Sequence, residues 1–116
     1  MIRTPTDTTL KKYGLSKWEW QDILANQGGV CGACGKEPSS GRLVTDHQHV
    51  KGWKKLPPEK RKTYVRGLLC WTCNHFRLGK GATVKNLFGA YQYLIDYEQR
   101  RLLENEVRTT LVGGTL

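Results

Sequence analysis

Two Cys-x-x-Cys pairs constrain this chain more than any other feature of its sequence. The first pair is Cys31 and Cys34, and the second is Cys70 and Cys73. Two such knuckles bring four thiolates to one ion and form a closed tetrahedral zinc site of the structural kind. The sequence therefore predicts one structural zinc ion bound by all four cysteines.

Other uses of four cysteines fit the chain less well. Two disulfides would suit a secreted protein, but the opening residues 1–5 show no signal-peptide pattern. A redox pair with two unrelated cysteines is the other alternative, but neither pair has the strand-to-helix context of a thioredoxin. No apolar run reaches the roughly 18 residues of a membrane span. We expect a soluble protein of the cytoplasm.

Chain length and net charge limit the possible fold and the possible partners of this protein. The chain has 116 residues, room for a single domain over 1–116, and so small a core benefits from a structural metal. Lys and Arg total 19 against 10 Asp and Glu, which gives a net charge of +9. Such a charge favours a polyanionic partner, most commonly nucleic acid. A basic protein without such a partner is the alternative.

The first third of the chain predicts one well-defined helix. Residues 1–14 are polar and are expected to form an arm or one short helical turn. Ser16 can cap the start of a helix, and the side chain of Glu19, the third residue of that helix, can bond back to the Ser16 amide. Gly28 and Gly29 can end the helix. Trp18 and Trp20 then either stack on bases or, as is more common on an amphipathic helix, pack against protein.

The rest of the chain predicts two strands and two further helices. Residues 42–47 and 64–69 are strand-like, and the intervening 51–62 is expected to be an exposed basic loop. A short helix should follow Cys73, and a long amphipathic helix should run over 83–104 with its apolar residues in the core. The predicted core is 15–104, with 105–116 as a frayed tail. The apolar residues of the long helix are Val84, Leu87, Phe88, Tyr91, Leu94, Ile95 and Leu102.

Together these elements predict a β-β-α unit whose ends are joined by the zinc knuckles, with Asp46, His47 and Asn74 near one another. This arrangement resembles the ββα-metal, or HNH, nucleases, and more closely the recombination endonuclease VII family of phage junction-resolving enzymes. The resemblance extends over about residues 13–100. The residues that carry it are Tyr13-Gly14-Leu15, the segments 27–31, 46–49 and 65–70, Cys34, Cys73-Asn74 and Leu78-Gly79.

The resemblance implies an α+β fold with a small ββα-metal core stapled by the four-cysteine zinc site and flanked by the two helices. It also implies a metal-dependent DNA endonuclease. Asp46 and Asn74 would hold Mg²⁺ or Mn²⁺ through oxygen ligands, and His47 would be the general base. His49 lies two residues further along an extended chain, so it faces the same side as His47 and is a candidate to assist.

Candidate contacts to DNA surround these residues. Arg66 and Arg77 are candidates for binding phosphate, and so are Lys54 and Lys55 of the basic loop. A solvated side chain is the alternative for each of them. His75 is a candidate phosphate contact or further ligand, and an ordinary surface histidine is the alternative.

Two questions stay open at this stage. Junction-resolving members of the family work as intertwined dimers, and a homodimer through residues 87–102 would allow two cuts in branched DNA, whereas a monomer would nick duplex. The competing function is a zinc-knuckle module that binds nucleic acid without catalysis. In that case Asp46 and His47 are only polar residues at a strand end.

Overall fold

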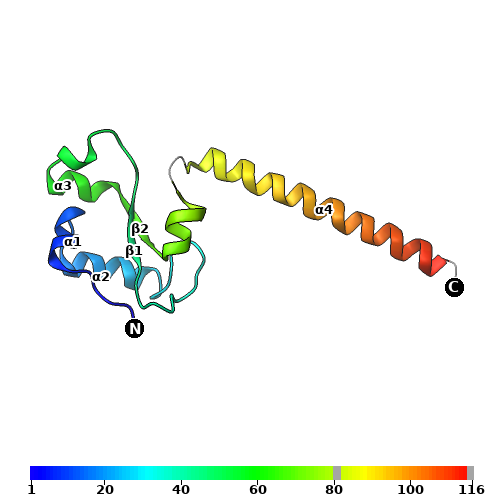
Figure 1. Ribbon diagram of the computed structural model, residues 1–116, viewed down its shortest axis with the longest axis horizontal. Helices are drawn as coiled ribbons and strands as arrows, with labels where there is room; N and C mark the ends of the chain where they lie inside the picture. The colour runs from blue at the N-terminus through cyan, green and yellow to red at the C-terminus, as the bar shows by residue number, and fades with distance from the viewer. Residues whose placement is uncertain (80–81, 115–116) are drawn as a thin grey trace. The chain divides into compact units, whose positions relative to one another are not determined.

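The computed structural model describes residues 1–79 and 82–114, with side chains through residue 107. It divides the chain into two compact units, Met1–Lys80 and Gly81–Leu116 (Figure 1). The first unit contains both cysteine pairs and both strands. The second contains one long helix. That the whole chain is a single domain stays a prediction.

The first unit is built on a two-stranded antiparallel sheet. Strand β1 spans Val44–His47 and strand β2 spans Val65–Leu69, each slightly shorter than the sequence predicted. Leu68 of β2 is fully buried, and Thr45 and Asp46 of β1 are also buried. The small sheet therefore places a carboxylate inside the protein.

A β-bulge interrupts the sheet beside this carboxylate. Asp46 pairs with Gly67, but the next residue, His47, pairs with Val65. Arg66 is thus the extra residue of β2, opposite the step from Asp46 to His47. A bulge increases the local twist and redirects the side chain of its extra residue.

Helix α2 (Lys17–Asn26) begins with the predicted capping box. The Ser16 hydroxyl accepts a hydrogen bond from the Glu19 amide at 3.1 Å, and the Glu19 carboxylate accepts one from the Ser16 amide at 2.9 Å. Exposed backbone N–H groups of the first turn are satisfied in this way.

The two tryptophans of α2 have different environments. Trp20 is fully buried and its indole N–H donates to the Thr45 hydroxyl at 3.1 Å, which docks α2 on β1. Trp18 keeps 72% of its surface exposed. Packing against protein, the commoner of the two expectations, therefore holds for Trp20.

The C-terminal end of α2 is tied to β2 by one side chain. The Gln27 amide donates to the carbonyl oxygens of Val30 at 2.8 Å and Leu68 at 2.9 Å, and its oxygen accepts from the Leu68 amide at 2.8 Å. A Cβ on Gly67 would lie 2.8 Å from this oxygen, and one on Gly32 would lie 3.1 Å away. A side chain at position 67 would therefore displace the Gln27 amide, and one at position 32 would crowd it.

Residues 1–14 are not a free arm. They include helix α1 (Asp7–Lys12), the short helical alternative, which the Thr6 hydroxyl caps by accepting from the Thr9 amide. Leu10 and Tyr13 are buried in the core of the first unit. The polar composition of this segment concealed two residues that pack.

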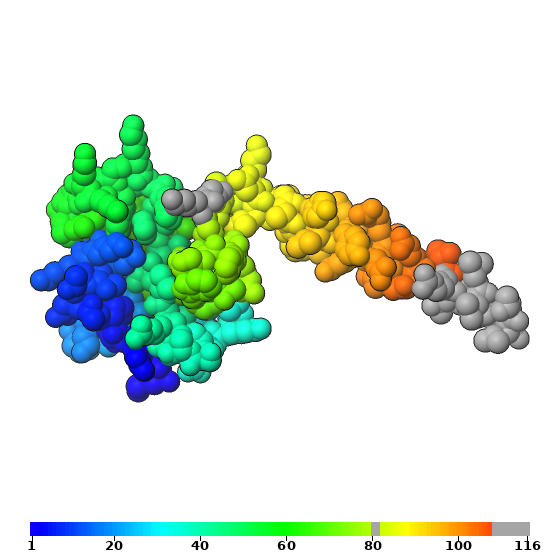
Figure 2. All heavy atoms as spheres, viewed as in Figure 1, coloured from blue at the N-terminus to red at the C-terminus, as the bar shows by residue number. Residues whose placement is uncertain are grey.

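The segment 51–62 was predicted to be an exposed loop, and this prediction was wrong in part. It folds into a 3-10 helix (Trp53–Lys55) and helix α3 (Pro58–Arg61), followed by a second 3-10 turn. Trp53 is buried against Tyr13, with ring centroids 5.7 Å apart. In the space-filling view, α1 lies directly against this segment (Figure 2). Its lysines stay exposed.

Cys73–Arg77 forms the short helix predicted after the second cysteine pair, with the wider turns of a π-helix. Such turns are rare and occur frequently at functional sites.

Helix α4 (Val84–Gly114) forms the second unit and is longer than the predicted 83–104. The backbone of the predicted frayed tail is helical through residue 114. The prediction that its apolar residues lie in the core was wrong. All of them except Ile95 are exposed in this single chain, and the half-buried Ile95 does not belong to the core. No helix in the described part of the chain is long and apolar enough to cross a membrane.

Candidate metal centre and active site

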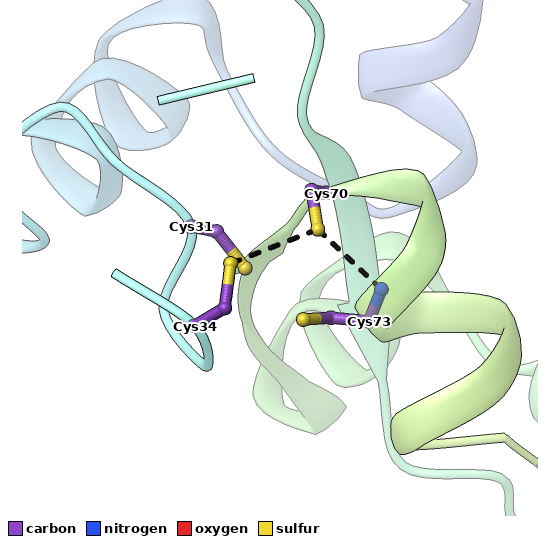
Figure 3. A group of neighbouring side chains, drawn as sticks. All are labelled: Cys31, Cys34, Cys70 and Cys73. Carbon is purple, nitrogen blue, oxygen red and sulfur yellow. Dashed lines mark hydrogen bonds between the residues drawn. The ribbon is translucent and has the colours of Figure 1, made fainter. Parts of the chain in front are cut away.

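The four cysteines converge as the sequence predicted (Figure 3). Their sulfur atoms lie within 4.8 Å of one another, and those of Cys34 and Cys70 are 3.9 Å apart. A tetrahedral ion with Zn–S bonds of about 2.3 Å requires sulfur atoms about 3.8 Å apart. The group could therefore hold a zinc ion with only a small inward shift of its side chains.

Hydrogen-bond donors approach three of the four sulfur atoms. The backbone amides of Ala33 and Cys73 donate to the sulfurs of Cys31 and Cys70, both at 3.4 Å. The guanidinium of Arg77 donates to the Cys73 sulfur at 2.9 Å. Arg77 thus contacts the metal centre, and its predicted phosphate contact stays a prediction.

The two most buried cysteines differ in acidity. Burial alone would raise the pKa of Cys31, but hydrogen bonds from backbone amides outweigh it and lower the pKa to about 6. Burial raises the pKa of the Cys73 thiol to about 11, against the opposing effect of Arg77. Because metal ligation requires thiolates, binding of an ion at neutral pH should release a proton from Cys73.

Asp46 lies at the bulge of the sheet with both carboxylate oxygens engaged. Arg66 Nε donates to Oδ2 at 2.7 Å and Arg66 Nη2 donates to Oδ1 at 3.0 Å. The Asp46 side chain is 6% exposed and that of Arg66 is 38% exposed. A pocket of about 330 Å³ beside this pair is lined also by Gln27 and Leu78.

His47 is held in a stack of rings. Its imidazole lies 4.0 Å from the Trp53 ring at 20° and 4.8 Å from the His49 ring at 25°, with Tyr13 5.7 Å away. His47 and His49 therefore lie on the same side, as predicted. Burial, and then the charge of His49, lower the pKa of His47 below its usual value. This shift favours the neutral form of the imidazole.

The remaining predicted residues lie on two segments. Asn74 is half-buried on the π-helix, where its backbone amide donates to the Cys70 carbonyl at 3.0 Å. His75 is exposed and stacks on Trp71 at 4.3 Å. Lys54 and Lys55 are exposed on the 3-10 helix that carries Trp53. The functional roles of these four residues stay predictions.

Sequence reasoning assigned no structural role to three residues that shape the site. Gln27 joins the first knuckle to β2, and Tyr13 and Trp53 surround His47. Trp53 gave a signal that could have been used, because a large aromatic residue inside a lysine-rich segment has to pack somewhere. Its partner could not be read from the sequence.

Known proteins resemble this chain over most of its length. The sequence model of recombination endonuclease VII matches residues 6–100. The Gene 59 protein of Mycobacterium phage L5 is 34% identical over 89 residues, covering 75% of this chain and 48% of that protein. The Gene 59 protein of Mycobacterium phage D29 is also 34% identical over 89 residues, covering 76% and 46%. The chain thus spans about half the length of these relatives, and no solved structure matches it.

Proposed function

This chain belongs to the recombination endonuclease VII family, and from that premise we propose that it is a metal-dependent DNA endonuclease of the HNH, or ββα-metal, type. One observation carries the proposal. Asp46 and His47 stand in consecutive positions at the bulge of a sheet whose second strand leads directly into the cysteine centre. A carboxylate and an imidazole thereby occupy consecutive positions on a fixed support.

His47 is proposed to be the general base that takes a proton from the attacking water. Its lowered pKa leaves the imidazole free to accept a proton at neutral pH. Stacking between Trp53 and His49 restricts rotation of the ring, so the accepting nitrogen keeps its direction. His49 is proposed to support this orientation and to contact phosphate.

Asp46 and Asn74 are proposed to hold Mg²⁺ or Mn²⁺, because a carboxylate and an amide oxygen suit a hard cation. When bound, such an ion neutralises the negative charge that develops on the phosphate. The carboxylate is buried at the sheet and Asn74 directly follows a cysteine ligand of the second knuckle. The structural zinc would then fix the position of Asn74 without taking part in the reaction.

DNA binding is proposed to rest on the excess of positive charge. Lys54 and Lys55 project from the segment that packs beside His47, and His75 and Arg77 lie on the π-helix next to Asn74. If these two groups of side chains contact phosphates, they would place a DNA strand over Asp46 and His47.

The shape of the DNA substrate depends on oligomeric state. Helix α4 carries exposed apolar residues at helical spacing, including Leu87, Tyr91 and Leu94. We propose that a second copy of the chain covers this face, which would give two active sites and cleavage of branched DNA. A monomer would nick duplex. The phage origin of the relatives supports action in the host cytoplasm.

A non-catalytic zinc-knuckle module that binds nucleic acid is the second candidate. It is favoured by one observation, because both oxygens of Asp46 already pair with Arg66. A protein that binds DNA but leaves a supercoiled plasmid intact in Mg²⁺ or Mn²⁺ would support this alternative.

The deciding experiment measures nicking of a supercoiled plasmid and of a four-way junction with Mg²⁺, and again with EDTA. Wild-type protein should cleave only with Mg²⁺. Asp46→Ala, His47→Ala and Asn74→Ala should keep zinc and DNA binding but lose about two or more orders of magnitude in cleavage. Raised Mg²⁺ should partly restore the Asp46 and Asn74 variants but not the His47 variant. Equal cleavage by the wild type and all three variants would exclude the proposed roles of these residues in catalysis and cation binding.

A further inference from the structure

The pairing of Asp46 with Arg66 has to be reconciled with binding of a cation. Two hydrogen bonds of 2.7 and 3.0 Å join the guanidinium to both oxygens of a carboxylate that is 6% exposed. Bidentate, charge-assisted pairs of this kind are among the stronger hydrogen-bonded contacts in proteins. A divalent cation that approaches Asp46 therefore finds both carboxylate oxygens already paired with the positive charge of Arg66.

The position of Arg66 in the sheet allows it to leave. It is the extra residue of the bulge, so it pairs with no residue of β1 in the register of the two strands. Its side chain is 38% exposed and lines the pocket beside Asp46, so the guanidinium has open space to enter. Departure from the carboxylate therefore leaves the sheet pairing and the cysteine centre intact.

We propose that Arg66 is a positioning residue that serves as a replaceable counter-ion for Asp46. Before the cation binds, the guanidinium neutralises the buried carboxylate and fixes its orientation. Binding of a divalent cation displaces the guanidinium, which is then available to a DNA phosphate. The inference rests on the proposed function, because it takes Asp46 to be a cation ligand.

The first test measures Mn²⁺ affinity without DNA, by the electron paramagnetic resonance signal of free Mn²⁺, on zinc-loaded protein at fixed pH. Arg66→Gln should bind Mn²⁺ at least about tenfold more tightly than wild type, equivalent to about 1.4 kcal/mol. Arg42→Gln is the matched control, since it removes the same charge from an arginine in the segment before β1. It should stay within about twofold of wild type.

The results separate the inference from the function on which it rests. Unchanged or weaker Mn²⁺ binding by Arg66→Gln, with binding still lost in Asp46→Asn, overturns the counter-ion role alone. Mn²⁺ binding that is absent, or indifferent to Asp46→Asn, overturns both the proposed cation site and the inference. A purely structural Arg66 would lower the melting temperature without tightening Mn²⁺ binding.

A second measurement uses wild-type protein and so does not depend on whether a variant folds. The Arg66 Nε–H should give a protected signal in ¹H–¹⁵N spectra, because it donates to Asp46 at 2.7 Å. Saturating Mg²⁺ should abolish that protection while the amide signals of the cysteine knuckles stay unchanged. A protected Nε–H that persists after the Asp46 backbone signal has shifted to its Mg²⁺-bound position would refute displacement.

Discussion

Replacement of Gln27 by alanine tests how the first unit is held together. The side chain makes three hydrogen bonds, two to carbonyl oxygens and one from the Leu68 amide. Each contributes about 0.5–1.5 kcal/mol net, so together they supply about 1.5–4.5 kcal/mol. The Leu68 carbonyl keeps a partner in the Gly32 amide at 2.9 Å, but the buried Leu68 amide loses its acceptor. We therefore expect a loss of about 3 kcal/mol in the free energy of unfolding.

The assay is urea unfolding of zinc-saturated protein, followed by the fluorescence of its tryptophans, with free zinc held constant. Gln21→Ala is the matched control, because Gln21 sits on the same helix and makes one hydrogen bond, to the Thr4 hydroxyl at 3.1 Å. It should lose less than about 1.5 kcal/mol. Gln27→Glu should cost at least as much as Gln27→Ala, since it turns an acceptor toward two carbonyl oxygens. A Gln27→Ala protein no less stable than Gln21→Ala would refute the reasoning.

Four further predictions concern metal, catalysis, DNA and assembly. Cys70→Ser should lose zinc and folded structure together, and a folded, zinc-free variant by circular dichroism and elemental analysis would contradict this. His49→Ala should lose less cleavage activity than His47→Ala in the plasmid assay, and the reverse order would move the base to His49. DNA affinity should fall steeply between low and physiological salt, because a chain of net charge +9 binds by displacing counter-ions, and a salt-independent binding constant would disprove this. Leu94→Glu should convert a dimer to a monomer in light scattering, whereas an unchanged mass argues against assembly through α4.

Local signals in the sequence predicted the fold well where the partners are close in the chain. The capping box at Ser16 and Glu19 formed as expected, because both halves lie within one helical turn. The two cysteine pairs also met as expected, since each knuckle has a fixed local shape and four thiolates have few other arrangements. The strands between them were correctly placed apart from their ends.

Long-range partners could not be predicted in the same way. Arg66 looks like a free cation in the sequence, but it pairs across a bulge with Asp46, which lies 20 residues earlier in the chain. A bulge depends on strand register, which no single residue type announces. The apolar periodicity of α4 correctly indicated a helix, but it could not show whether its own chain covers the apolar face.

The contacts around the bulge also fix the number of residues that the chain can have between Val65 and Cys70. Between Val65 and Cys70 the backbone is anchored at successive points, with Arg66 at Asp46, Leu68 at Gln27 and Cys70 at the cysteine centre. Insertion of one residue there would send every later side chain to the opposite face of the strand. The exposed residues 59–60 lie outside the sheet, on the four-residue helix α3. Insertion of one residue within 66–69 should therefore abolish folding, whereas one residue inserted at 59–60 should disturb only α3.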